Sequence, residues 1–184
     1  MIFTILIFIA LYLFILYISP LRYNNYLPTI VVYPNNEVEI KKVETEINRR
    51  THFDIQFFKK TDPSVSYAFR DILPQYSIGE LDTLSTKYNI IIYILKYCIN
   101  RPRPIQVNPD LNVLESNTGN TPAYPAGHAF QGYLLSKILS KKHPEKRQEL
   151  EHIAEKCNIV RIKAGLHYPS DGLFSKKIVD YLLL

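Results

Sequence analysis

Three short stretches of this 184-residue chain hold basic and histidine side chains at spacings that suit chemistry on an anion. They lie at 96–103, 125–128 and 161–171. In the first, Lys96 closes an apolar stretch and Arg103 follows in a proline-rich loop. Taken alone, this pair is a lysine that extends its ammonium group to water and a solvated loop arginine.

The second stretch, Pro125-Ala126-Gly127-His128, precedes an amphipathic run and predicts the start of a helix. Unpaired backbone N–H groups and the positive end of the helix dipole make such a position an anion site before any side chain is counted. Many helices begin after a similar turn, so this stretch indicates a functional site only if the other two stretches converge on it.

The third stretch places His167 and Asp171 four residues apart around a proline that starts a helix, so the carboxylate can reach the imidazole. A carboxylate on one ring nitrogen fixes the tautomer and leaves the other nitrogen available as a nucleophile or base. Arg161 adds a cation nearby. By itself this is a surface His–Asp pair beside an arginine.

Together the three stretches supply the parts for chemistry on a phosphoryl group. That chemistry needs cationic donors for three oxygens, an in-line nucleophile and an acid for the leaving group. Lys96, Arg103 and Arg161 can provide the charge, and the backbone N–H groups near Gly127 add donors. Because three cations can do a metal's electrostatic work, no metal is expected.

The same residues resemble the type-2 phosphatidic acid phosphatase (PAP2) superfamily, which also holds bacterial class A acid phosphatases and vanadium haloperoxidases. Its motifs are Lys-x6-Arg-Pro, Pro-Ser-Gly-His and Ser-Arg-x5-His-x3-Asp. The matching blocks here begin at Lys96, Pro125 and Val160. The spacing selects Arg103 over Arg101, because an isoleucine stands seven residues before Arg101.

The resemblance extends over residues 77–184 and implies an all-α helical bundle with the site at its centre. It implies that His167 forms a phosphohistidine that water hydrolyses, that Asp171 holds His167, and that His128 protonates the leaving oxygen. Vanadate could occupy the phosphate site, and no cofactor is implied. The positions implied to bind phosphate are Lys96, Arg103, Arg161, Ala126 and Gly127, the last through its backbone N–H.

Two positions depart from the family pattern. Ala126 replaces the usual serine and removes one hydroxyl donor to the phosphate. A hydrogen bond to a charged group contributes about 1.5–3 kcal/mol, so activity is expected to fall without vanishing. Val160 replaces the serine before Arg161 and matters less, because the arginine carries the charge.

An apolar run at residues 2–19 ends at Pro20 and is followed by Arg22. Its length is at the lower edge of what spans a bilayer, and it lacks the basic start and cleavage site of a signal peptide. We therefore predict a transmembrane anchor at 1–19, a linker at 20–36 and a PAP2-like domain at 37–184. The charges C-terminal to the run indicate a single-pass membrane protein whose catalytic domain faces the cytoplasm.

Helical spacing of apolar residues dominates the predicted domain, without strand-like alternation of useful length. Cys98 and Cys157 fall at apolar helical positions and are expected to be reduced core residues. The expected helices cover 37–50, a short segment from Asp62-Pro63, one long segment from the Ser77 capping box to Arg101, and segments beginning after Gly127, Pro144 and Pro169.

The balance of 22 Lys and Arg against 17 Asp and Glu gives a net charge of +5, which suits a phosphorylated substrate or an anionic membrane. No basic run interleaved with aromatic residues points to a nucleic-acid partner. The leading prediction is a membrane-anchored, metal-independent phosphatase that acts on phosphate monoesters or lipid (di)phosphates. The alternatives are a vanadate-dependent haloperoxidase and a phosphate- or lipid-phosphate-binding protein weakened in turnover.

Overall fold

The structure is a computed structural model that describes Ile7, Ala10 and residues 31–183. The stretch from 31 to 183 contains helices and no strand, which confirms the all-α prediction. In chain order the elements are α2 (Asn36–Asn48), α3 (His52–Thr61), α4 (Ser66–Ile72), α5 (Ile78–Thr86), α6 (Asn89–Ile99), α7 (Pro104–Val107), α8 (Gly127–Lys142), the 3-10 turn η1 (Pro144–Lys146), α9 (Arg147–Lys163) and α10 (Pro169–Leu182).

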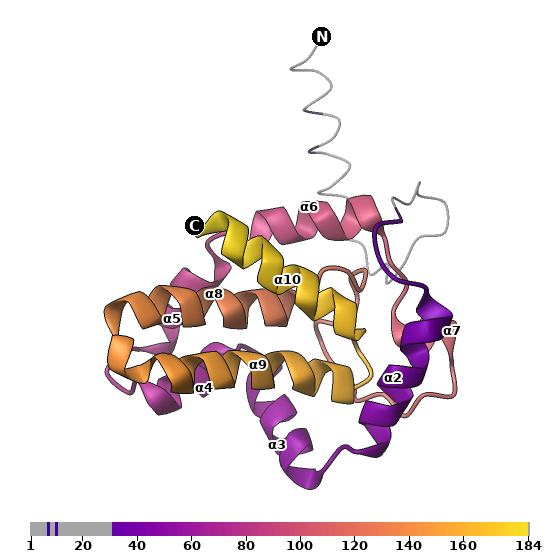
Figure 1. The fold of residues 1–184 in the computed structure, drawn as a ribbon, viewed down its shortest axis with the longest axis horizontal. Helices are drawn as coiled ribbons and strands as arrows, with labels where there is room; N and C mark the ends of the chain where they lie inside the picture. Colours follow the sequence, from indigo (N-terminus) through magenta and orange to yellow (C-terminus); the bar gives the residue numbers. More distant parts are fainter. Residues whose placement is uncertain (1–6, 8–9, 11–30, 184) are drawn as a thin grey trace.

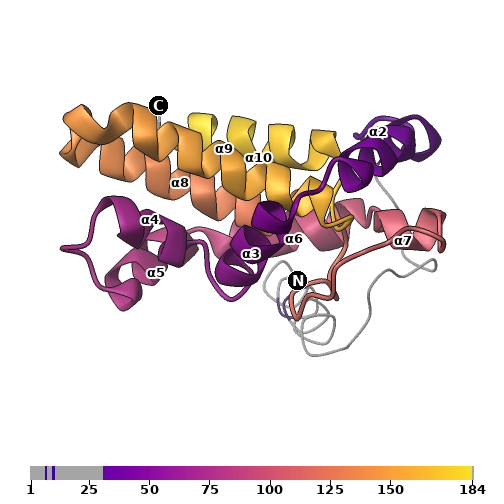
Figure 2. The ribbon, with the colours of Figure 1, turned by 90° about the horizontal axis from the view of Figure 1, so that it is seen from below.

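The helices form two layers. Helices α8, α9 and α10 lie side by side in one layer, and α3, α4, α5 and α6 lie across its other side (Figures 1 and 2). Helix α8 packs against both α9 and α10, while α3 and α4 contact α9 and α5 contacts α8. The main core fills the space between the layers with fully buried side chains, among them Phe69, Leu81, Phe130, Leu134, Leu135, Leu139 and Leu150.

Local sequence signals set several helix starts as predicted. Ser77 and Glu80 form a capping box, in which the Glu80 N–H donates to the Ser77 hydroxyl oxygen and the Ser77 N–H donates to the Glu80 carboxylate. Helix α10 begins at Pro169, and α8 begins at Gly127. These two starts bring the second and third motif stretches into the bundle.

The expected long helix from Ser77 to Arg101 is wrong, because the chain forms two helices there. Helix α5 ends at Thr86, and α6 starts at Asn89 after Tyr88 leaves the helical conformation at φ −116° and ψ 17°. Helix α6 then ends at Ile99, since Asn100 adopts a left-handed conformation at φ 52°. The break gives α6 its own direction across the bundle (Figure 1).

Smaller corrections concern other boundaries. Asp62 does not start a helix but ends α3, and α4 begins only at Ser66. Helix α3 was not predicted, although Thr51 and Asp54 form its capping box. The helix expected at Pro144 starts as a 3-10 turn before α9, and the short helix α7 interrupts a predicted loop. These differences move boundaries or add short helices, and they leave the helical class unchanged.

The cysteine prediction is half correct: Cys157 is buried, but Cys98 is exposed on α6. No helix among the described residues has the length and apolar character needed to cross a membrane. The predicted anchor at 1–19 lies outside the described residues except for Ile7 and Ala10, so it stays a prediction.

Candidate functional site

A cavity of about 440 Å³ opens between α6, the start of α8 and the loop that precedes α8. Residues from all three motif stretches line it, although they are far apart in the chain. The predicted site residues on its wall are Lys96, Arg103, Gly127, His128 and His167. The structure therefore brings five of the eight predicted site residues together at one cavity.

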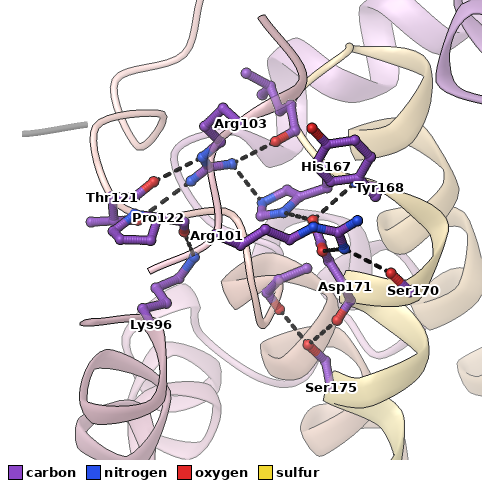
Figure 3. A network of polar contacts seen from close by, with 12 residues as sticks. Lys96, Arg101, Arg103, Thr121, Pro122, His167, Tyr168, Ser170, Asp171 and Ser175 are labelled. Carbon is purple, nitrogen blue, oxygen red and sulfur yellow. Dashed lines mark hydrogen bonds and ion pairs between the residues drawn. The ribbon is translucent and has the colours of Figure 1, made fainter. Parts of the chain in front are cut away.

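Two buried cations lie on one side of this cavity. The Lys96 ammonium group donates to the Pro122 carbonyl oxygen at 2.5 Å. Arg103 donates from Nε to the Thr121 carbonyl at 2.8 Å and from Nη1 to the Leu166 carbonyl at 2.7 Å (Figure 3). Burial and the neighbouring Arg103 hold the pKa of Lys96 well below its usual range. An anion in the cavity would relieve this repulsion.

The hydrogen bonds of His167 determine its tautomer. Arg103 Nη1 lies 2.9 Å from His167 Nε2, and a guanidinium can only donate, so Nε2 is the unprotonated nitrogen. Nδ1 therefore carries the proton and donates to Asp171 Oδ2 at 3.1 Å (Figure 3). Burial and the adjacent cations hold the pKa of His167 well below its usual value. The result is a neutral imidazole whose Nε2 lone pair faces Arg103, and both residues line the cavity.

Asp171 lies behind His167 in the first turn of α10. Its Oδ2 also accepts from the Tyr168 N–H at 2.9 Å, while Oδ1 accepts from Arg101 at 2.6 Å. Burial raises the pKa of Asp171 to about 6, and Arg101 opposes that rise. The carboxylate is thus ionised at neutral pH and is held by donors on both oxygens.

The start of α8 is tied to α10 through the backbone of Ala126. The Ala126 N–H donates to the Asp171 carbonyl at 3.2 Å, and its own carbonyl accepts from the Ser175 hydroxyl at 2.9 Å. Ala126 is fully buried and gives the helix no side-chain cap. A methyl group built on Gly127 would lie 4.0 Å from Lys96 Cε, so the Gly127 backbone runs directly beside the lysine.

His128 is also neutral in this arrangement. Its Nε2 lies 3.0 Å from the Asp62 carbonyl oxygen, which can only accept, so Nε2 carries the proton. Burial and the charge of Arg161 lower the pKa of His128 to about 3. A proton on Nδ1 therefore requires a negative charge in the cavity.

Arg161 occupies a different position from the other predicted phosphate ligands. It is buried and donates to Asp62 Oδ1 at 2.5 Å, to the Ser116 hydroxyl at 3.1 Å and to the Thr118 hydroxyl at 3.0 Å. Within the described part of the chain, its Nε has no hydrogen-bond partner. Asp62 thus joins Arg161 to His128 behind the cavity wall, a link that the sequence did not indicate.

Sequence reasoning also missed Arg101, which is fully buried against Asp171. Its signal was present, since Arg101 and Arg103 alternate with two prolines, but the spacing favoured only Arg103 for the anion. The polar part of the cavity wall was missed as well and carries no sequence pattern; it comprises Asn89, Asn117, Thr118, Asn120, Thr121 and Gln131. No group of three His, Cys, Asp or Glu side chains in residues 31–183 is placed to hold a metal ion.

Comparison with known proteins adds one partial match. A segment of 62 residues, 34% of the chain, is 37% identical to the non-specific acid phosphatase of Salmonella typhimurium (strain LT2). The match covers 23% of that phosphatase, so the chain corresponds to less than a quarter of its length. No protein-family model matches the chain.

Proposed function

We propose that the protein is a metal-independent phosphatase of the PAP2 type that hydrolyses phosphate monoesters through a phosphohistidine. The observation that carries the proposal is the orientation of His167. Its Nδ1–H is directed to Asp171, and its unprotonated Nε2 faces Arg103 at the cavity, which Lys96, Arg103 and His167 line together. The partial similarity to an acid phosphatase supports the same class of reaction.

In the proposed first step, the phosphoryl group enters the cavity and displaces Arg103 from His167 Nε2. Lys96, Arg103 and the N–H groups at the start of α8 bind its oxygens. The Nε2 lone pair attacks phosphorus as the bond from phosphorus to the leaving oxygen breaks. Asp171 stabilises the positive charge that develops on His167, and His128 gives the leaving oxygen its proton.

In the proposed second step, water attacks the phosphohistidine, and the neutral His128 takes a proton from that water. The P–N bond breaks, inorganic phosphate leaves, and His167 regains its lone pair. Arg161 contributes through Asp62 and His128, because its guanidinium donates to the Asp62 carboxylate and the Asp62 carbonyl accepts from His128. Burial and the positive charge of Arg161 together keep His128 neutral until a dianion arrives.

A lipid (di)phosphate at a membrane is a further proposed substrate, supported by the apolar run at residues 2–19. A single-pass anchor with the domain on the cytoplasmic side would present the cavity to such lipids. A panel of phosphatidate, isoprenyl diphosphate and soluble monoesters on the anchored protein distinguishes lipid from soluble substrates. Equal rates with and without the run 2–19 on every lipid would contradict a role for the anchor.

The second candidate function is anion binding with weakened turnover, which Ala126 favours because it lacks the hydroxyl donor of the family motif. Ala126→Ser separates the two functions. A phosphatase is expected to gain turnover from the added donor. A binding protein would tighten its hold on vanadate and still release no phosphate.

The test of the proposed function is hydrolysis of an aryl phosphate by the full chain in the presence of EDTA, followed by rapid quenching to trap phosphoenzyme. Wild type is expected to turn over, to be inhibited by vanadate and to yield acid-labile phosphohistidine. His167→Ala should abolish the trapped species, whereas His152→Ala, a change at an exposed position of α9, should leave it intact. Failure of wild type to hydrolyse any of the esters and lipid phosphates would overturn the proposal.

A further inference from the structure

Arg101 is the centre of a buried network on the side of Asp171 that faces away from the cavity. Its Nη1 donates to Asp171 at 2.6 Å and to the Ser170 hydroxyl at 2.7 Å, and its Nη2 donates to Glu39 at 2.9 Å (Figure 3 shows the Asp171 and Ser170 contacts). Nε donates to the Asn36 side chain at 2.9 Å. All donor nitrogens of this side chain are thus engaged.

Aromatic rings hold the guanidinium in place. Its Cζ lies 3.8 Å from the centre of the Tyr168 ring and 4.6 Å from that of Tyr33. A planar guanidinium that is already stacked on aromatic rings loses little further side-chain entropy when it donates to two carboxylates. Arg101 therefore has one well-defined orientation, with no exposed surface.

The network contains two carboxylates for one guanidinium. Glu39 is 3% exposed and Asp171 is 0% exposed. The Ser170 hydroxyl accepts from Arg101 and donates to Glu39. Two buried carboxylates without Arg101 could not both stay ionised, since burial and their mutual repulsion favour the protonated forms. The charge of Asp171 thus depends on how Arg101 divides its attraction between the two.

We propose that Arg101 and Glu39 are positioning residues that set the charge and orientation of Asp171, and through it the tautomer of His167. This inference rests on the proposed function, in which Asp171 must be an ionised acceptor for the Nδ1 proton of His167. Neither residue lines the cavity, so neither is expected to touch the substrate.

The two residues act on Asp171 with opposite signs. Removing the Arg101 charge favours protonation of Asp171. Removing the Glu39 charge leaves Asp171 as the single carboxylate that the guanidinium stabilises, and so favours the ionised form of Asp171. Other groups that act on the same carboxyl stay constant between the variants. They are Lys96 from α6, Arg103 from the loop before α7, Tyr124 before α8, and His167 and Tyr168 at the start of α10.

The experiment compares Arg101→Gln, Arg101→Lys and Glu39→Gln with wild type in the full chain. The first readout is the titration of the Asp171 carboxyl by ¹³C NMR, which requires no turnover. Arg101→Gln should move its midpoint up by about 1–3 pH units, the size of an adjacent arginine's effect on a carboxyl group. Arg101→Lys should move it up by less, and Glu39→Gln should move it down.

The second readout is the acid limb of the pH–kcat profile, which should shift in the same directions. Asp54→Asn is the matched control, because it removes one carboxylate from the Lys163 ion pair, a partly buried pair outside the network. It should lower stability without moving either the titration or the acid limb. If Arg101→Gln fails to fold, Arg101→Lys and Glu39→Gln still test the inference, because they are expected to shift the Asp171 titration midpoint in opposite directions.

Midpoints of Asp171 that stay within error of wild type in Glu39→Gln and Arg101→Lys would overturn the inference, whatever the activity. An inactive wild type with opposite shifts of the midpoint would refute the phosphatase and leave the positioning role standing. An active wild type whose Arg101 and Glu39 variants lose stability as Asp54→Asn does, with no shift of the Asp171 midpoint, would reduce Arg101 and Glu39 to structural residues.

Discussion

Binding of a dianion in the cavity is expected to take up a proton at His128. Burial and Arg161 lower the pKa of His128 to about 3, and its Nε2 proton is directed to the Asp62 carbonyl. The imidazole is therefore neutral at any pH where the protein would work. A bound dianion reverses the sign of the local charge and makes protonation of Nδ1 favourable.

The size of this effect follows from Coulomb's law. Two negative charges about 5 Å from the imidazole, at an effective dielectric constant of about 20, favour the protonated form by roughly 6–7 kcal/mol. That corresponds to about five pKa units, enough to carry the pKa of His128 from about 3 to neutrality or above. Binding of the dianion should then weaken about tenfold for each unit of rising pH between pH 5 and 7.

Sulfate is the probe for this prediction, because it stays a dianion throughout that range. Calorimetric titration in buffers of different ionisation enthalpy measures the protons taken up per sulfate bound. Wild type should take up close to one proton more than His128→Gln, while His152→Gln, a change at an exposed histidine, should match wild type. Equal proton uptake in wild type and His128→Gln would refute the reasoning.

Three further outcomes are expected. The free energy of unfolding should fall as pH drops below about 6.5, because the unfolded chain protonates its histidines there while His128 and His167 stay neutral in the fold. Urea titrations should show a fall of up to roughly 1.4 kcal/mol per pH unit for each of these two histidines. Asp171 opposes this fall, because its pKa of about 6 in the fold lies above its value in the unfolded chain. A flat profile between pH 7 and 5 would contradict these shifts. Asp171→Asn should lower kcat on the order of 10²–10⁴-fold, because an amide no longer enforces the Nδ1–H tautomer; a rate within threefold of wild type would argue against that role. Gly165→Ala should lower stability by about 1–3 kcal/mol, because φ at this position is +77° and the new Cβ would lie 2.9 Å from a valine methyl carbon. Thermal melting measures this loss. Gly79→Ala is the control and should show no such loss, because a Cβ there would meet no atom within 4 Å.

The sequence alone determined the helical class and predicted five of the residues that line the cavity. Helix caps and prolines act over a few residues, so Ser77, Gly127 and Pro169 marked helix starts that the structure confirms. The four-residue spacing of His167 and Asp171 likewise placed them within hydrogen-bond reach. These features depend on local geometry, which a single stretch of sequence contains.

Only the tertiary structure decided which partner each buried charge has. Arg101 pairs with Glu39 and Asp171, 62 and 70 residues away, and Arg161 pairs with Asp62, 99 residues away. No spacing rule reaches that far, because the partners come from helices whose packing depends on the whole core. A buried charge must be paired by whichever group the fold places beside it, so Arg161 is directed to Asp62 and Arg101 to the carboxylates behind the site.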